Sequence, residues 1–255
     1  MTTLQASLAD RVKAHWDDPA VESMYDKYLL RAEIDLIRAR IPDGAKVLDA
    51  GCGEGEGTLA YASIPRVRIH AADYSRTRLK KARRRLADCL NVALLRVDFL
   101  NPIGLEHDYD AIVSQRFLIN LLDPEDQQQV LRDLTGRLKP GGRLILLEGS
   151  VPGTAALNDV RAQFGLAAIP VQWHNRFLDD EDLVEWMAAH GYPLVDHASL
   201  GAYFMLTRAI RPALESGPLA WDCPFNEAAA SPEMAATLGP LARFSRLKLW
   251  VFGKP

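Results

Sequence analysis

A glycine-rich stretch at residues 45–57 constrains the fold of this chain more than any other feature. Its sequence is AKVLDAGCGEGEG, in which the apolar pair Val47-Leu48 is followed by an acid, Asp49. Alternating glycines come next, and residues 58–62 then read as a helix. The pattern predicts a strand, a loop and a helix. Glycine there lets a ligand approach the backbone, and the amides at the helix N-terminus point at it.

The same stretch argues against two phosphate-binding loops. A dinucleotide-binding loop needs glycine at its third fingerprint position, which is Glu56 here. A P-loop ends in Gly-Lys-Ser/Thr, and the nearby lysine, Lys46, precedes the loop. Asp49, Glu54 and Glu56 also place three carboxylates within eight residues, with no cation among them. We therefore expect a pyrophosphate to be repelled and a ligand with ammonium and sulfonium groups to be favoured.

The stretch resembles motif I of the class I S-adenosylmethionine (SAM) dependent methyltransferases, an acid followed by Gly-x-Gly-x-Gly. Leu-Lys-Pro-Gly-Gly at residues 138–142 also resembles the family pattern. The resemblance covers residues 45–150 well and the remainder in outline. It implies an α/β fold with a doubly wound, seven-stranded, mostly parallel sheet, N-terminal helices, and a lid of helices and loops inserted before the last strand. It also implies SAM as cofactor, S-adenosylhomocysteine as product, and contacts from Asp49, Gly51 and Gly53.

Apolar runs alternate with helical patterns along the chain, which by itself predicts a doubly wound parallel sheet. After the first strand, further strands are expected at residues 67–73, 92–97, 109–114, 143–148, 195–200 and 246–252. The last of these alternates basic and apolar side chains, as a half-exposed edge strand would. Helices are expected at residues 4–16, 21–40, 75–88, 124–138 and 179–190.

We expect one domain with three parts. Residues 1–44 form a helical cover, residues 45–150 the SAM-binding core, and residues 151–255 a substrate-facing half with an insertion at 201–243. Residues 149–177 and the insertion fall outside the regular pattern, so they are the expected substrate cover.

Several residues are expected to hold the cofactor. Asp73 ends the second strand about twenty residues past the loop, where a carboxylate can accept both hydrogen bonds of a ribose diol. The alternative for Asp73 is a helix N-cap. The resemblance implies an adenine clamp at Asp98-Phe99. Gln115 follows the fourth strand at the carboxyl edge of the sheet, where it is placed to meet SAM. Other candidate contacts are Tyr74 beside the ribose, and Tyr28 and Arg31 over the methionine end, although those two could equally serve helix packing.

The candidate substrate residues follow the carboxyl ends of strands, where open α/β sheets bind ligands. His174 is the candidate base and Glu148 a second one, as base or as anchor for an amine; the alternative for His174 is a packing histidine. We expect one cavity facing the SAM methyl group to be lined by Arg116, Asn120, Trp173, His174, Asn175 and Tyr203.

Composition and charge limit the kinds of partner that this protein is expected to bind. The 255 residues carry a net charge of −3, no apolar run approaches a membrane span, and residues 1–5 lack the features of a signal peptide. Three scattered cysteines and no clustered ligands argue against a disulfide framework or a metal site. Residues 76–85 hold seven basic residues, which we interpret as a solvated face and not a nucleic-acid site. We expect a cytoplasmic protein without membrane, metal or nucleic-acid partners.

The resulting functional hypothesis is methyl transfer from SAM to a nitrogen or oxygen nucleophile of a small molecule, in a secondary-metabolite or sugar pathway. The residues after the fourth strand lack the Asn/Asp-Pro-Pro-Tyr signature of enzymes that methylate nucleobases or glutamine amides. Two alternatives stay open at this point: SAM-dependent alkyl transfer or cyclisation, and a SAM-binding regulator without activity. The oligomeric state is left open as well.

Overall fold

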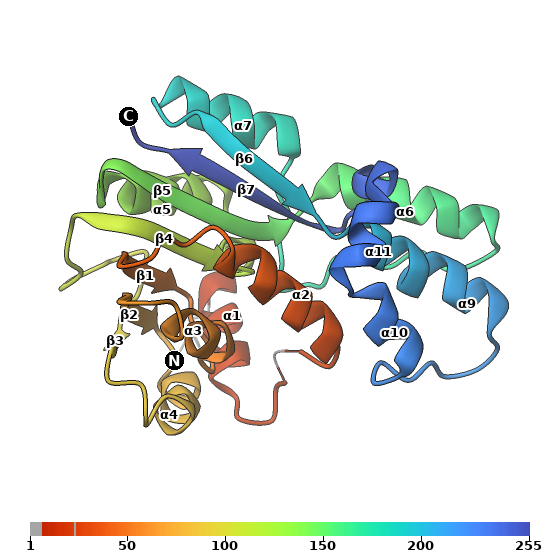
Figure 1. Cartoon of the computed structure of the whole chain (residues 1–255), viewed down its shortest axis with the longest axis horizontal. Coiled ribbons are helices and arrows are strands. Elements are labelled where there is room, and N and C mark those ends of the chain that lie inside the picture. The colour runs from red at the N-terminus through yellow and green to blue at the C-terminus, as the bar shows by residue number, and fades with distance from the viewer. Residues whose placement is uncertain (1–6, 23) are drawn as a thin grey trace, which may run out of the picture.

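The computed structural model describes residues 7–22 and 24–255, and these form a seven-stranded sheet covered by helices (Figure 1). The strand order is β3-β2-β1-β4-β5-β7-β6. Neighbours from β3 to β5 pair in parallel, while β7 runs antiparallel to both β5 and β6. The predicted fold class is therefore confirmed. The strands are β1 (Lys46–Ala50), β2 (Arg68–Asp73), β3 (Val92–Arg96), β4 (Tyr109–Gln115), β5 (Leu138–Gly149), β6 (Leu194–Ser199) and β7 (Leu247–Gly253).

The last strand is not at the edge of the sheet, so that prediction is wrong. β7 lies between β5 and β6, and most of its residues are buried. Two basic side chains, Lys248 within β7 and Arg246 just before it, have local partners. Lys248 pairs with Asp180, and Arg246 donates to the carbonyls of Ile169 and Pro170. The basic side chains that alternate with apolar ones along residues 246–252 therefore contact specific protein partners, and neither face of the strand is left to solvent.

Helices cover both faces of the sheet. Leu29, Ile34 and Ile37 of α2 and Tyr61 of α3 belong to the core on one face. On the other face the core includes residues of α5 and α7. No helix among the described residues is both long enough and apolar enough to cross a membrane. The helices before β6 are α1 (Leu8–Asp17), α2 (Lys27–Arg38), α3 (Glu56–Ala62), α4 (Arg76–Arg85), α5 (Pro124–Gly136), α6 (Val151–Gln163) and α7 (Asp180–Ala189).

The expected first helix begins near residue 4, and residues 4–6 lie outside the described residues. The signal-peptide prediction concerns residues 1–5, which also lie outside them.

The helix α6 was not expected, because residues 149–177 show no clear helical periodicity. Local chemistry starts it instead: Ser150 accepts from the N–H of Gly153, and Pro152 occupies the first turn.

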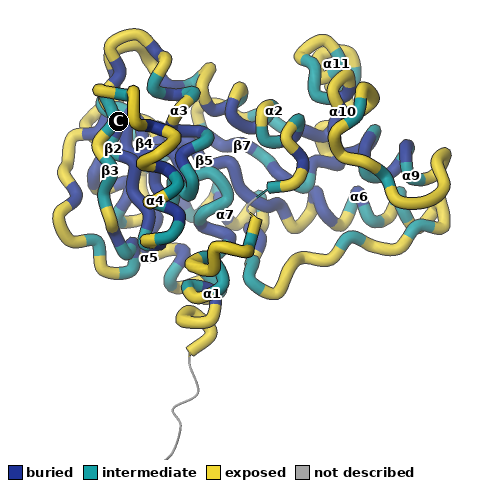
Figure 2. Tube along the Cα trace, turned by 90° about the horizontal axis from the view of Figure 1, so that it is seen from below, coloured by how far each residue is buried: buried dark blue, intermediate teal, exposed yellow. Residues whose placement is uncertain are grey.

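Residues 200–246, here called the lid, connect β6 to β7 as a series of short helices. The lid includes a π-helical segment, η2, whose wide turns follow α8 directly. The lid helices α9, α10 and α11 lie with α6 beyond the carboxyl ends of β4 and β5 in both views (Figures 1 and 2). Its elements are α8 (Gly201–Phe204), η2 (Met205–Ile210), α9 (Arg211–Leu214), α10 (Pro224–Ala229), α11 (Pro232–Thr237) and η3 (Gly239–Phe244).

Buried residues are concentrated along the strands, whereas α1 and the outer turns of the lid are largely exposed (Figure 2).

At Gly153 the first turn of α6 touches the lid backbone. A Cβ atom built on Gly153 would lie 1.9 Å from the carbonyl oxygen of Ser245. This contact fixes α6 against the segment that leads into β7.

We predict that Gly153→Ala lowers the free energy of unfolding by about 3 kcal/mol, because backbone atoms must move apart to admit the methyl group. Urea denaturation measures the change. Gly136→Ala in α5 is the matched control, since nothing lies within 4 Å of a Cβ there. The control should be neutral or slightly stabilising. Equal stability of the two variants would contradict the close packing of α6.

Candidate functional site

One cavity of about 750 Å³ runs along the carboxyl edge of the sheet and under the lid. We distinguish a loop half, a lid half and a junction between them. The loop half includes Asp49, Gly51, Gly53, Asp73, Asp98 and Phe99. The junction includes Trp16, Gln115, Arg116, Asn120, His174 and Asn175. The lid half includes Arg161, Ile169, Phe204, Arg208, Trp221 and Arg246.

The glycine loop has the close approach that its sequence predicts. Gly51 and Gly53 have φ angles of 73° and 54°, in the left-handed region that favours glycine. A Cβ on Gly51 would lie 2.5 Å from the Cβ of Phe117, so a larger residue would push the loop off the end of β4. The backbone of the loop therefore forms one wall of the cavity.

Asp73 faces the loop from the end of β2. Its Oδ2 accepts from the N–H of Gly53 at 2.9 Å, and its Oδ1 accepts from the N–H of Ser75 at 2.8 Å. Ser75 is the N-cap of α4, so the N-cap alternative for Asp73 is wrong. Burial raises the pKa of Asp73, although these backbone donors oppose the shift. Each oxygen keeps a lone pair for a ligand hydroxyl.

Two further acids border the loop half. Asp49 accepts from the Thr58 hydroxyl at 2.6 Å, and burial raises its pKa to about 6, so it is largely ionised at neutral pH. Asp98 forms an ion pair with Lys13 of α1 at 2.5 Å. The hydroxyl of Tyr74, another lining residue, donates to the Lys13 carbonyl. Lys13, whose role no sequence pattern indicates, therefore ties α1 to the predicted adenine end.

The carboxylates of the glycine loop are not without cations, so that part of the electrostatic argument is wrong. Glu54 accepts from both Arg78 and Lys81 of α4. Glu56 lies 3.3 Å from Arg85 of the same helix. Among the described residues, Asp49 alone of the three loop acids has no basic partner.

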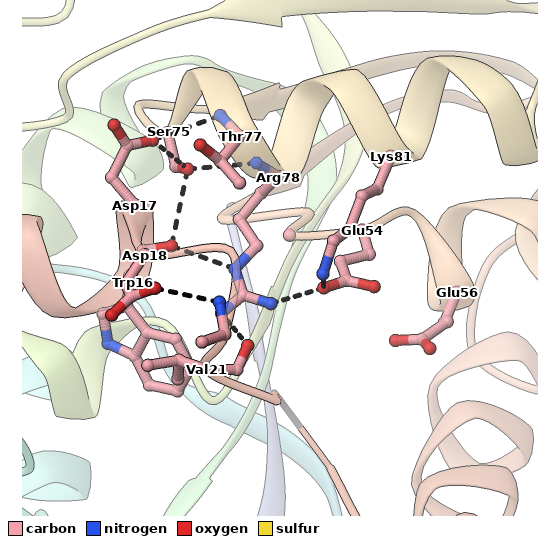
Figure 3. A network of polar contacts seen from close by, with 12 residues as sticks. Trp16, Asp17, Asp18, Val21, Glu54, Glu56, Ser75, Thr77, Arg78 and Lys81 are labelled. Carbon is pink, nitrogen blue, oxygen red and sulfur yellow. Dashed lines mark hydrogen bonds and ion pairs between the residues drawn. The ribbon is translucent and has the colours of Figure 1, made fainter.

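The interpretation of α4 as a solvated basic face is wrong for Arg78, which is only 2% exposed. Its Nε donates to the carbonyl of Trp16 at 3.0 Å and its Nη2 to that of Val21 at 2.7 Å, while Nη1 reaches Glu54 (Figure 3). Asp17 adds bonds to the Ser75 hydroxyl and to the N–H of Thr77. The sequence spacing does indicate this burial, because Arg78 lies four residues before the buried Ala82 and therefore on the same inward face of α4.

The segment after β4 forms the wall of the junction. Arg116 adopts a positive φ of 51°, and its Nε lies 3.1 Å from the fully buried carboxylate of Glu33 in α2. Gln115 donates to the same Glu33 oxygen at 2.7 Å. Burial raises the pKa of Glu33, and the Arg116 charge opposes that shift. Glu33, another residue missed from sequence, thus orients both side chains toward the cavity.

Asn120, His174 and Asn175 meet at the junction as predicted. Asn120 Oδ1 accepts from Trp16 Nε1 at 3.1 Å and from Asn175 Nδ2 at 3.0 Å. The His174 ring stacks on His15 with centroids 4.4 Å apart. Its Nδ1 is buried and has no hydrogen-bond partner among the described residues. Burial and the nearby His15 lower the pKa of His174.

Trp173 and Tyr203 do not line this cavity, so their prediction as substrate contacts is wrong. Trp173 is 48% exposed, and the Arg11 guanidinium lies 5.3 Å from its ring centroid. Tyr203 is buried and donates its hydroxyl to Asp26 at 2.7 Å. Phe204 and Thr207, the next positions on the inner side of the lid, line the cavity instead.

Tyr28 and Arg31 also lie outside the lining, so their predicted place over the methionine end is wrong. The Tyr28 hydroxyl donates to Asp222 at 3.2 Å, and Arg31 lies 3.8 Å from Glu227. Both side chains therefore fasten α2 to the outer part of the lid. From this part of the chain, Met24, Tyr25, Asp26, Leu29 and Leu30 line the cavity.

Glu148 cannot touch an acceptor, because it is fully buried and lies outside the lining. Its carboxylate accepts from the Ser114 hydroxyl at 2.6 Å and from three successive backbone N–H groups, at residues 117–119. Burial raises its pKa to about 7. The prediction of Glu148 as base or amine anchor is wrong; it instead positions the backbone beside Arg116 and Asn120.

No group of His, Cys, Asp and Glu side chains within the described residues is arranged to hold a metal ion.

The site consists of a glycine loop, a row of acids, and a polar junction that leads under an apolar lid. An extended ligand with a ribose fits the loop half, because the Asp73 oxygens face the cavity beside an uncovered loop backbone.

Comparisons with known proteins agree with one another, because each finds similarity to methyltransferases. Residues 47–142 match the family model described as "Methyltransferase domain". A demethylmenaquinone methyltransferase of Clavibacter sepedonicus is 28% identical over 187 residues, covering 67% of this chain and 75% of that protein. A ubiquinone/menaquinone biosynthesis C-methyltransferase of Ectopseudomonas mendocina is 30% identical over 191 residues, covering 66% of this chain and 73% of that protein.

Solved structures share the fold at lower identity. Magnesium protoporphyrin IX methyltransferase from Synechocystis PCC 6803, with bound S-adenosylhomocysteine, superposes with a TM-score of 0.59. The two sequences are 15% identical, and the match covers 96% of this chain and 94% of the other.

We predict that Asp73→Ala weakens SAM binding about 10- to 100-fold, because a ribose diol loses charge-assisted hydrogen bonds. Calorimetry with the purified variant measures the affinity. Asp159→Ala, an exposed acid on α6, is the control and should bind SAM like the wild type. Unchanged affinity in Asp73→Ala would contradict the ribose assignment.

We predict that Glu148→Ala lowers the free energy of unfolding by about 3 kcal/mol or more, since it leaves buried N–H groups unpaired. Chemical denaturation tests this, with the exposed Glu185→Ala in α7 as control, expected within about 0.5 kcal/mol of wild type. A Glu148→Ala protein of normal stability would contradict the structural role.

Proposed function

This chain belongs to the class I SAM-dependent methyltransferases, and on that premise we propose that it methylates a small molecule held in the lid half of its cavity. The observation that carries the proposal is the continuity of the cavity from the glycine loop to the lid. A cofactor in the loop half and an acceptor under the lid could thereby meet at the junction without leaving the protein.

The chain's own residues have a limited task in such a reaction. Bound SAM supplies a methyl group already activated by its sulfonium. The protein must orient the nucleophile and exclude water, and these two effects account for much of the catalysis available to such a site. Arg116 and Asn120, held by Glu33 and by the Trp16 and Asn175 contacts, form a fixed wall for this purpose.

We propose that the nucleophile is a hydroxyl or amine that His174 deprotonates. Because burial lowers the pKa of His174, its ring is neutral at physiological pH and can accept a proton. Because Nδ1 is buried, Nε2 is the ring nitrogen that would accept the proton. His15, which stacks on this ring, also lowers the pKa of His174 and so favours its basic form.

The lid half favours an acceptor with an apolar body. Phe177, Phe204, Leu219 and Trp221 line it, whereas a sugar would need many polar partners. We therefore propose a natural-product pathway in preference to a sugar pathway. The names of the two curated relatives point the same way, because demethylmenaquinone and ubiquinone are small molecules with apolar parts.

The test is incubation of the protein with SAM and a pool of aromatic phenols and amines. Mass spectrometry should detect S-adenosylhomocysteine together with a product heavier by one CH₂ unit. A product formed from the pool without S-adenosylhomocysteine would indicate cyclisation or another SAM chemistry. SAM binding with no product from any acceptor class would contradict the proposed methyl transfer.

For His174→Ala we predict a fall in kcat of about 10²- to 10⁴-fold with SAM affinity nearly unchanged, since a general base is lost. In the wild type, kcat/KM should fall as the pH drops through a pKa below the usual 6.5 of histidine, and the variant should lose that limb. His190→Ala, at the exposed end of α7, is the control. An unchanged pH profile in His174→Ala would contradict the role of this residue.

A further inference from the structure

Three arginines from separate elements line the lid half of the cavity: Arg161 of α6, Arg208 of η2, and Arg246 just before β7. Arg208 forms an ion pair with Asp26. Among the residues that the structure describes, no carboxylate lies within ion-pair distance of Arg161 or Arg246. The lid half therefore carries an excess of two positive charges that the protein itself does not balance.

Arg161 and Arg246 converge on one short segment. Arg161 donates from Nε and Nη2 to the carbonyl of Ala167, at 2.9 and 2.7 Å, and from Nη1 to that of Arg208. Arg246 donates to the carbonyls of Ile169 at 3.2 Å and Pro170 at 2.6 Å. These bonds hold both guanidinium groups against residues 167–170, of which Ile169 lines the cavity.

Neither guanidinium is saturated by these contacts. A guanidinium has five N–H donors in a rigid fork. The carbonyl bonds use three donors of Arg161 and two of Arg246, so both retain N–H groups. A carboxylate or phosphate matches such donors in geometry as well as in charge.

The surroundings make this arrangement costly without an anion. Arg246 lies 5.0 Å from the Phe177 ring centroid and Arg208 lies 4.0 Å from that of Trp221, and such cation–π contacts offset part of the desolvation cost but supply no counter-charge. Burial, and then the Arg208 charge, lower the pKa of Arg246 to about 10, and the same causes lower the pKa of Arg161. The carbonyl bonds that anchor the loop leave the charges of Arg161 and Arg246 without a neutralising partner.

We propose that the acceptor carries an oxyanion, a carboxylate or a phosphate, which binds between Arg161 and Arg246. This inference rests on the proposed function and specifies its substrate class: an apolar body with an anionic group at the lid end and the nucleophile at the junction. Arg208, neutralised by Asp26, contributes by covering Trp221 and by accepting the Arg161 bond through its carbonyl.

The experiment measures ligand binding to the full chain saturated with S-adenosylhomocysteine. Calorimetry compares two pairs of similar shape: 2-naphthoate with 2-naphthamide, and 2-naphthyl phosphate with its uncharged dimethyl ester. In the wild type, at least one anion should bind about tenfold or more tightly than its neutral partner, and added salt should weaken that preference. The pair with the larger ratio identifies carboxylate or phosphate as the source.

Arg246→Gln and Arg161→Gln should each reduce the anion-to-neutral ratio about tenfold. The exposed Arg84→Gln in α4 is the matched control and should leave the ratio unchanged. A variant that merely loosens the loop at 167–170 weakens both members of a pair and keeps their ratio, which would overturn the proposal. If a variant does not fold, equal binding of anions and neutral partners by the wild type overturns it as well.

This readout is independent of turnover. Anion preference without methylation of any acceptor would support the oxyanion site and contradict the proposed function. Efficient methylation of neutral acceptors together with flat binding ratios would support the function and overturn this inference.

Discussion

The buried guanidinium of Arg78 joins separate segments of the chain at the loop half of the cavity. It binds Glu54 of the glycine loop and the carbonyls of Trp16 and Val21, so α1 and the segment after it are held against that loop. Breaking a buried pair of this kind leaves an uncompensated charge, which is strongly destabilising. The N-terminal cover thereby becomes part of the site, and Trp16 reaches Asn120 from a fixed position.

Two other buried acids support the junction from inside. Glu148 accepts three backbone N–H groups after β4, while Glu33 holds Arg116 and Gln115. Burial raises the pKa of both acids, which is the electrostatic cost of placing them in the core. In return, the segment between the two halves of the cavity is fixed before any ligand binds. Such preorganisation favours in-line geometry between a methyl donor and an acceptor.

The backbone pattern of the sequence predicts the sheet and its loop-half acids well, because strand ends and glycine spacing determine where Asp49 and Asp73 lie. It does not predict which way a helical side chain turns when a remote acid can capture it. Tyr203 turns to Asp26, and Tyr28 turns to Asp222, neither of which is near in sequence. The prediction for Arg78 is wrong for the same reason, because its charge suggests exposure to solvent whereas Glu54 is available inside to pair with it.

We expect the loop half to bind the cofactor with its sulfur facing the lid half. A crystal structure of the protein with S-adenosylhomocysteine tests it most directly. That structure should show the ribose hydroxyls on Asp73, the adenine beside Asp98 and Phe99, and the sulfur open to the junction of Asn120 and His174. A ribose bound away from Asp73, or a sulfur that protein atoms separate from the lid half, would contradict it.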